Sequence, residues 1–277
     1  MNKTGAPTWP PKPPGTHAEP TRTAIEPKAV GRCAEFMGAI EHIWLGMNHG
    51  TFNARARDVG WAPDSRDDYC ARCGGSVGPG EADGDGCAAC RKRRLVWEHA
   101  IRLGSYEGLL AETVREVKFT AWRRLGSDLG RLLGERIGDE LRRVDVRADE
   151  TMVVPVPMSW AIRMNRGIDH TLVLARAASR ASGVPVARSL RRRHGPTQLD
   201  VPPSKRAENV RGAFRCRHSR KTARVVIILD DVRTTGATMT AAARTLQNGL
   251  GKGVRIWSAV VAVTPARDRR EPIGAGT

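Results

Sequence analysis

The sequence predicts an α/β protein in which helices flank a mainly parallel sheet, with a small four-cysteine unit ahead of it. Short β-rich runs alternate with helical patterns through the C-terminal half, which is typical of parallel strands joined by crossover helices. Two C-x-x-C pairs lie close together in the first third of the chain. With 277 residues, 40% of them hydrophobic, the chain can build one large domain or a medium domain with a small appendage.

The two ends of the chain are expected to lie outside this core. Residues 1–32 are rich in proline and lack apolar periodicity, so we expect a disordered leader. Residues 33–68 are expected to form a short helix and a linker, because apolar side chains recur at helical spacing over 33–47. That helix would either pack on the body of the protein or dock a partner. Residues 266–277 are expected to be a frayed tail.

The four cysteines form a metal-ligand pattern. Cys70 and Cys73 make one C-x-x-C pair, and Cys87 and Cys90 make another after 13 intervening residues. Two such turns can close a tetrahedral sulfur site, so we predict a structural Zn²⁺ ribbon over 69–94 with no open position for catalysis. Disulfide pairing is the alternative. We expect a reducing, cytoplasmic location because the sequence has no secretory signal, and no apolar run is long enough for membrane insertion.

Residues 95–265 form the predicted main domain. Apolar spacing predicts helices at 109–117, 129–141, 169–182 and 237–248. Runs of β-branched residues predict strands at 152–156, 184–190, 224–229 and 254–263. The alternation of these elements is the basis for the parallel sheet.

The most informative segment is V-V-I-I-L-D-D-V-R-T-T-G-A-T, residues 225–238. A buried strand ends in Asp230 and Asp231 at the edge where open α/β sheets bind ligands. The turn and helix start that follow can cradle a phosphate with N–H groups and hydroxyls. The cradle consists of Thr234, Thr235, Gly236, Ala237 and Thr238. Since the two acids suit ribose hydroxyls or a divalent cation, the pattern indicates a sugar-phosphate site. The alternative is a strand end followed by a Thr helix cap.

This stretch resembles the signature of the type I phosphoribosyltransferases, which hold 5-phosphoribosyl-1-pyrophosphate (PRPP). Four further features, in the right order over about residues 70–265, make the chain similar to the ComF branch, which is associated with DNA uptake and natural competence. They are the cysteine pattern, a Y-x-G to L-K-Y-like run (Tyr106 to Lys118 and Phe119), V-P-V-P at 154–157 with Arg163, Arg166 and Gly167, and Gln198, Arg206 and Asn209 before G-A-F at 212–214. The resemblance implies a type I phosphoribosyltransferase-like parallel sheet.

The resemblance also implies an enzyme that transfers a phosphoribosyl group from PRPP, with Mg²⁺, to an unidentified acceptor. Residues 234–238 would hold the 5′-phosphate, and Asp230 and Asp231 the ribose diol. Val156 and Pro157 would face the pyrophosphate from the neighbouring strand end, and Mg²⁺ would bridge pyrophosphate and ribose oxygens.

Four cations are assigned by the same resemblance. Lys118, Arg163 and Arg166 would be counter-charges for pyrophosphate, and Arg206 would reach the ligand from a long loop over 198–209. For the first three the alternative is a solvated surface charge, and for Arg206 it is an anchor that holds the loop to the body of the protein.

The chain departs from the family in having Asp169-His170 where Asn-Gln is usual and Phe119 where Tyr is common. The alternative to an enzyme is a non-catalytic protein that senses PRPP or handles single-stranded DNA together with competence-machinery proteins. The net charge of +17 favours polyanionic partners, and the basic run at 191–194 suits either a nucleic-acid backbone or a solvated strand end. Aromatic residues are only 5% of the chain, so stacking platforms for DNA bases are few.

Overall fold

The computed structural model describes residues 51–119, 123–159, 167–193, 212–217, 223–251 and 253–265. Contacts divide the chain into two compact units, Met1–Asn48 and His49–Thr277, and every described residue lies in the second. The predicted leader, the predicted helix over 33–47 and the predicted tail lie outside the described residues.

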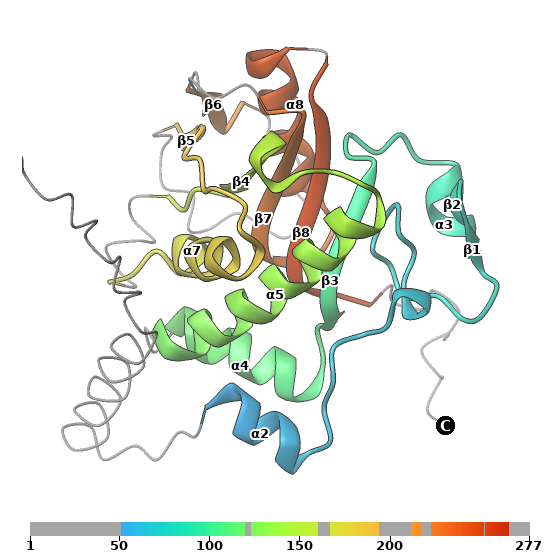
Figure 1. Ribbon diagram of the computed structural model, residues 1–277, viewed down its shortest axis with the longest axis vertical. Helices are drawn as coiled ribbons and strands as arrows, with labels where there is room; N and C mark the ends of the chain where they lie inside the picture. The colour runs from blue at the N-terminus through green and yellow to red at the C-terminus, as the bar shows by residue number, and fades with distance from the viewer. Residues whose placement is uncertain are drawn as a thin grey trace, which may run out of the picture. The chain divides into compact units, whose positions relative to one another are not determined.

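A four-stranded parallel sheet forms the centre of the second unit (Figure 1). Its order is β3 (His99–Ser105), β8 (Arg255–Val263), β7 (Val225–Arg233) and β4 (Thr151–Pro155). The central strands are almost wholly buried, as expected when helices cover both faces of a parallel sheet. The predicted α/β fold with a parallel sheet is confirmed.

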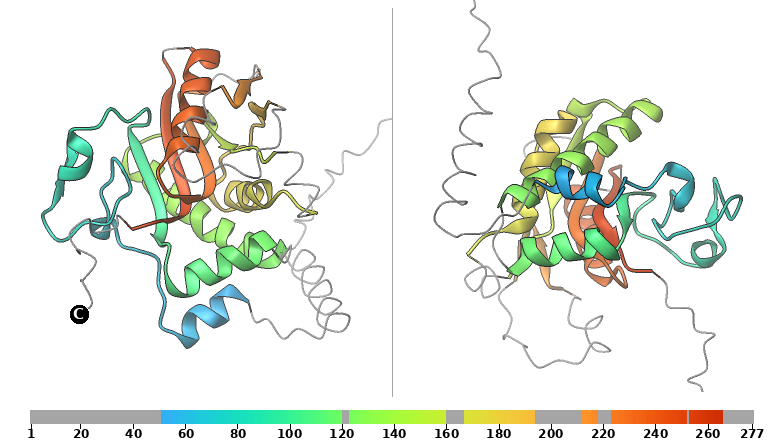
Figure 2. Two further views of the ribbon diagram at one scale, coloured as in Figure 1. Left: turned by 180° about the vertical axis from the view of Figure 1, so that it is seen from behind. Right: turned by 90° about the horizontal axis from the view of Figure 1, so that it is seen from below.

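Helices cover the two faces unequally. The helices α4 (Gly108–Phe119), α5 (Arg123–Arg143) and α7 (His170–Ser182) lie on one face, and α8 (Ala237–Leu250) lies on the other (Figure 2). Glycine lets α5 approach α7 closely. A Cβ on Gly134 would lie 2.4 Å from the Ala178 carbonyl oxygen, and one on Gly130 would lie 2.5 Å from that of Leu174.

The alternation of β7 sets the direction of the site residues. Ile227 and Leu229 belong to the core under α5 and α7, whereas Val226 and Ile228 belong to the core under α8. Because successive side chains of a strand point to opposite faces, the adjacent acids at the end of β7 must also separate. Asp230 is therefore on the α8 face, and Asp231 is on the α5–α7 face.

The strand predicted over 184–190 is wrong for most of its length. The structure has one parallel bridge from Val153 to Val186, and the next strand, β5 (Leu190–Arg192), pairs antiparallel with β6 (Phe214–Cys216) in a separate sheet. Pro185 accepts a hydrogen bond from the Val153 N–H but has no N–H of its own, so the ladder cannot extend through it.

The linker expected before the cysteine unit is also wrong in part, because it contains the helix α2 (Phe52–Asp58). The Thr51 hydroxyl caps its start by accepting from the Ala54 N–H at 3.2 Å. Phe52 is fully buried, and its N–H donates to Asp128 of α5 at 3.1 Å. A buried aromatic anchor thus holds this segment on the main domain.

The cysteine unit contains only short elements. They are the 3₁₀ helix η1 (Arg66–Asp68), the strands β1 (Ala82–Asp83) and β2 (Gly86–Cys87), and the helix α3 (Ala88–Arg91). A second 3₁₀ helix, η2 (Ala148–Glu150), leads into β4. With so little regular structure, the cysteine unit needs another source of stability, as small metal-bound units generally do.

Candidate functional site

The turn from β7 into α8 forms a small cavity at the carboxyl edge of the sheet. It is lined by Asp230, Val232, Arg233, Thr234, Thr235, Gly236, Ala237, Thr238 and Met239. Gly236 caps the helix with a left-handed φ of 78°, and a Cβ there would meet the Trp97 ring at 3.3 Å. The structure therefore brings the five predicted cradle residues together, and the backbone conformation at position 236 favours glycine.

Asp230 is the acid that faces this cavity. It is half-buried, and its Oδ1 accepts from the Asp231 backbone N–H at 2.9 Å. Burial, together with the neighbouring negative charge of Asp231, raises the pKa of Asp230 to about 8. A carboxyl group in this state can donate as well as accept a hydrogen bond near neutral pH.

Asp231 points the other way and does not line the cavity. Its Oδ1 accepts from the Val232 N–H at 2.6 Å, and its Oδ2 lies 3.1 Å from Lys118 Nζ and 2.7 Å from His170 Nε2. Burial alone would raise the pKa of this carboxyl, but the contacts with His170 and Lys118 lower it to about 2. Asp231 is therefore a buried anion whose two oxygens are both engaged.

The remaining predicted site residues divide into two groups. Val156 is buried and Pro157 is half-buried directly after β4, and the Val156 N–H donates to the Leu229 carbonyl at 2.9 Å. Both therefore lie at the same sheet edge as the acids. Arg163, Arg166 and Arg206 lie outside the described residues.

The four cysteines converge in the manner expected of a metal centre. Their sulfur atoms all lie within 4.8 Å of one another, with 3.7 Å between Cys70 and Cys90 and 3.7 Å between Cys73 and Cys87. Sulfurs placed tetrahedrally 2.3 Å from Zn²⁺ would be about 3.8 Å apart, so the spacing fits this ion. All four are free thiols, and a disulfide would need sulfurs about 2 Å apart.

Backbone groups support this sulfur cluster. The Cys87 N–H donates to the Cys70 sulfur at 3.3 Å, and the Gly75 N–H donates to the Cys73 sulfur at 3.4 Å. Burial by itself raises the pKa of Cys70, yet surrounding backbone N–H groups lower it to about 7, which favours the thiolate that a metal requires. Gly86 has a φ of 99°, and a Cβ there would lie 2.5 Å from the Cys90 sulfur.

A buried arginine of β3 joins the cysteine unit to the sheet. Arg102 is 2% exposed and donates to the Gly74 carbonyl and to the Ser76 hydroxyl, each at 3.0 Å. It also lies 2.5 Å from the Asp64 carboxylate. These bonds replace the water that a guanidinium would otherwise hold, so they fix the unit against the sheet edge.

Comparisons with known proteins find similarity to proteins named for competence and for DNA utilization. Competence protein F of Haemophilus influenzae is 25% identical over 193 residues, which are 68% of this chain and 82% of that protein. DNA utilization protein YhgH of Escherichia coli is 25% identical over 176 residues, 62% of this chain and 75% of that protein. These similarities support the resemblance to the ComF family. No protein-family model matches it.

Two solved structures overlap with this chain more loosely. Hypoxanthine-guanine phosphoribosyl transferase of L. donovani is 14% identical with a TM-score of 0.30, covering 50% of this chain and 67% of that one. A hypoxanthine phosphoribosyltransferase of Staphylococcus aureus is 15% identical with a TM-score of 0.28, covering 54% and 70%.

Two residues near the acids were not assigned to the site from sequence. His170 begins α7 next to its N-cap, Asp169, and contacts Asp231. Arg192 of β5 is half-buried; burial lowers the pKa of its guanidinium, and the charge of Asp230 opposes that change. The sequence signals for these two residues were the departure Asp169-His170 and the basic run at 191–194. Neither signal indicates that the residue lies near an acid of the site.

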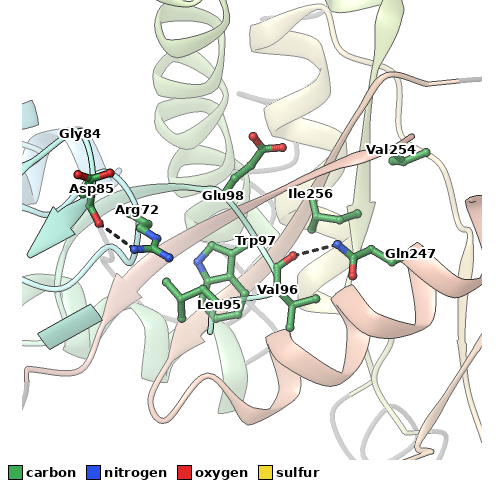
Figure 3. Close-up of a pocket in the computed structure, with 10 residues that line it drawn as sticks. All are labelled: Arg72, Gly84, Asp85, Leu95, Val96, Trp97, Glu98, Gln247, Val254 and Ile256. Atoms are coloured by element: carbon green, nitrogen blue, oxygen red, sulfur yellow. Dashed lines mark hydrogen bonds between the residues drawn. The ribbon is translucent and has the colours of Figure 1, made fainter. Parts of the chain in front are cut away.

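A larger cavity, of about 440 Å³, lies beside the cysteine unit and the end of α8 (Figure 3). Its lining includes Arg72 of the cysteine unit, Trp97, Gln247 at the end of α8, and Val254 and Ile256 at the start of β8. These positions belong to the amino edge of the sheet, whereas ligands of open α/β sheets bind at the carboxyl edge. No residue of the phosphate cradle lines it.

Within the described part of the chain, none of the helices is both long and apolar enough to cross a membrane.

Proposed function

We propose that this protein is a ComF-like phosphoribosyltransferase that binds PRPP with Mg²⁺ and acts in the uptake or use of DNA. The observation that carries the proposal is the cavity at the carboxyl end of β7, where one acid and a Thr-Thr-Gly turn line the same space. A sugar phosphate requires this arrangement, in which the turn binds the phosphate and the acid binds a sugar hydroxyl.

The residues would divide the work as follows. N–H groups and hydroxyls of residues 234–238 bind the 5′-phosphate, and Gly236 lets the backbone approach it. Asp230 binds a ribose hydroxyl, as donor or acceptor according to its protonation. Lys118 and the backbone after β4, at Val156 and Pro157, face the pyrophosphate. Holding both ends of the ligand orients the anomeric carbon and stabilises the charge that develops as pyrophosphate leaves.

Mg²⁺ fits this site as an ion brought by the ligand. Both oxygens of Asp231 are engaged, and the raised pKa of Asp230 favours its neutral form, so neither acid is a ready inner-shell ligand. Mg²⁺ keeps several waters and commonly binds through substrate phosphates. When bound, it would neutralise the departing pyrophosphate.

The test is calorimetric titration of PRPP with Mg²⁺ into the wild type and into Asp230→Asn. Asp149→Asn makes the same chemical change at an exposed acid before β4 and is the matched control. We expect binding to the wild type and to the control, and about a tenfold or greater loss in Asp230→Asn. No binding by folded, metal-loaded wild type would overturn the proposal; binding would justify screening acceptors for pyrophosphate release.

The net charge of +17 favours a second candidate, a non-catalytic protein that senses PRPP or handles single-stranded DNA. Four basic residues directly after Cys90 are exposed: Arg91, Lys92, Arg93 and Arg94. This function predicts salt-sensitive, sequence-independent DNA binding that Asp230→Asn leaves unchanged. PRPP binding without pyrophosphate release for any acceptor would favour it over the enzyme.

For the cysteine unit, we infer one structural Zn²⁺ per chain. Metal analysis of protein purified without chelators should give about one zinc per chain, lost in Cys73→Ser and kept in Cys216→Ser, whose thiol lies outside the cluster. A wild type carrying well under one metal per chain would contradict this inference.

A further inference from the structure

His170 is held in a fixed position against the buried acid of the site. It is 4% exposed, and it is the first residue of α7, whose N-cap Asp169 accepts from the Leu172 N–H at 3.1 Å. Its Nε2 lies 2.7 Å from Asp231 Oδ2. Its Nδ1 is buried, and among the described residues it has no hydrogen-bond partner. The ring therefore makes its one recorded polar contact with Asp231.

Asp231 is linked to the acid that faces the cavity. The two residues are adjacent in β7, and the backbone N–H of Asp231 donates to Asp230 Oδ1. A shift of the Asp231 carboxylate would therefore alter the backbone that positions the Asp230 side chain. Contacts that Asp231 makes on the α7 face thus bear on the position of Asp230 on the opposite face.

Lys118 and His170 contact the same carboxylate oxygen of Asp231. The Lys118 Nζ lies 3.1 Å from Oδ2, at the last turn of α4. An anionic ligand at the sheet edge would compete with Asp231 for this ammonium group. If Lys118 turned to the ligand without a replacement, Asp231 would remain a buried charge with fewer donors, which is costly.

We propose that His170 is a positioning residue that keeps the Asp231 carboxylate in place when Lys118 turns to the anionic ligand. The imidazole can donate from Nε2 both as its neutral Nε2–H tautomer and in its charged form, so the contact can form in either state. This inference rests on the proposed function. It adds that binding exchanges one partner of Asp231, Lys118, while the other, His170, stays.

Three substitutions separate positioning from packing. In His170→Gln, the side-chain amide can place an N–H near Asp231, whereas His170→Leu fills similar space without a donor. We expect PRPP affinity near wild type in His170→Gln and about a tenfold or greater loss in His170→Leu. His99→Leu is the matched control, because His99 makes the other buried histidine–carboxylate contact, with Glu140, away from the cavity. It should lower the melting temperature and leave PRPP affinity unchanged.

A double-mutant cycle tests the same pairing, and if His170→Leu folds poorly alone the comparison is made within the Asp231→Asn background. Asp231→Asn removes the buried charge, so in that background His170→Leu should cost no further affinity. Equal affinity in wild type and His170→Leu, equal losses in the Gln and Leu variants, or additive losses in the cycle would overturn the inference alone. A wild type that binds no PRPP would overturn the proposed function and this inference together.

Discussion

Two buried histidine–carboxylate contacts occur in the described part of the molecule, one in the scaffold and one in the candidate site. In the scaffold, His99 Nε2 of β3 lies 2.5 Å from Glu140 Oε1 of α5. In the site, His170 Nε2 of α7 lies 2.7 Å from Asp231 Oδ2 of β7. Burial alone would raise the pKa of each carboxyl, but the partners of each lower it to about 2.

The two contacts differ in what surrounds them. Glu140 is also paired with Arg143 at 2.5 Å and with Arg66 at 3.4 Å. Asp231 contacts Lys118 and directly follows Asp230, an acid that lines the cavity and whose pKa is raised to about 8. The scaffold pair is surrounded by arginines, whereas the site pair adjoins an acid that faces a cavity, as functional sites commonly do.

Removing the scaffold anion should have the largest effect on stability. Glu140→Ala leaves His99 without its carboxylate and removes hydrogen bonds to a charged group, so we expect the free energy of unfolding to fall by about 2–3 kcal/mol. Urea denaturation measures this. Glu135→Ala, at an exposed acid of the same helix, should cost less than about 0.5 kcal/mol. A loss in Glu140→Ala no greater than in the control would show that the pair does not stabilise the fold.

The pH dependence of that stability separates the pairs further. The folded pKa of Glu140 is depressed to about 2, so its contribution is present above the unfolded value of about 4.3 and is lost as pH falls toward 2. We expect wild type and Glu140→Gln to differ by about 2 kcal/mol at pH 6 and to converge only as pH falls to about 2, the folded pKa. A constant difference across that range would contradict the depressed pKa.

Much of this fold could be predicted from sequence, because the informative signals are local. Runs of β-branched residues identified β7 and β8, and the C-x-x-C spacing identified the metal-ligand set. The strand β3 was missed because Arg102 and Gly104 interrupt its apolar pattern. Arg102 is buried only because the cysteine unit supplies acceptors, which is a tertiary effect.

The candidate site was predicted in its parts but not in its arrangement. The turn and both acids follow from the D-D-x-x-T-T-G pattern, yet their separation onto two faces depends on β7 extending through Arg233. The contact of His170 with Asp231 joins residues 61 positions apart, and no local periodicity reports it. Local chemistry thus identifies the groups, while the packing of α7 on the sheet decides which of them meet.

The acid that faces the cavity should affect stability in the opposite direction from Glu140. The folded pKa of Asp230 is raised to about 8, so the folded state holds a proton that the unfolded state releases above about pH 4. Its contribution to stability therefore falls as pH rises from 4 to 8. Because Asp230 is only half-buried, we expect Asp230→Asn to gain about 1 kcal/mol relative to wild type at pH 8 and nothing at pH 4. Denaturation at both values tests this, and a variant less stable than wild type at pH 8 would contradict it.

The smallest effect on stability is expected when the cation beside each carboxylate is replaced by methionine. The Arg143 side chain is 52% exposed, so Arg143→Met should lower the free energy of unfolding by about 0.5 kcal/mol and leave PRPP affinity unchanged. Lys118→Met should cost comparably little stability, since His170 still contacts Asp231, but should weaken PRPP binding because it removes a counter-charge for pyrophosphate. Denaturation and calorimetry on both variants compare the two cations directly. Equal PRPP affinity in the two would mean that Lys118 serves the fold as Arg143 does, and the distinction between scaffold pair and site pair would then rest on Asp230 alone.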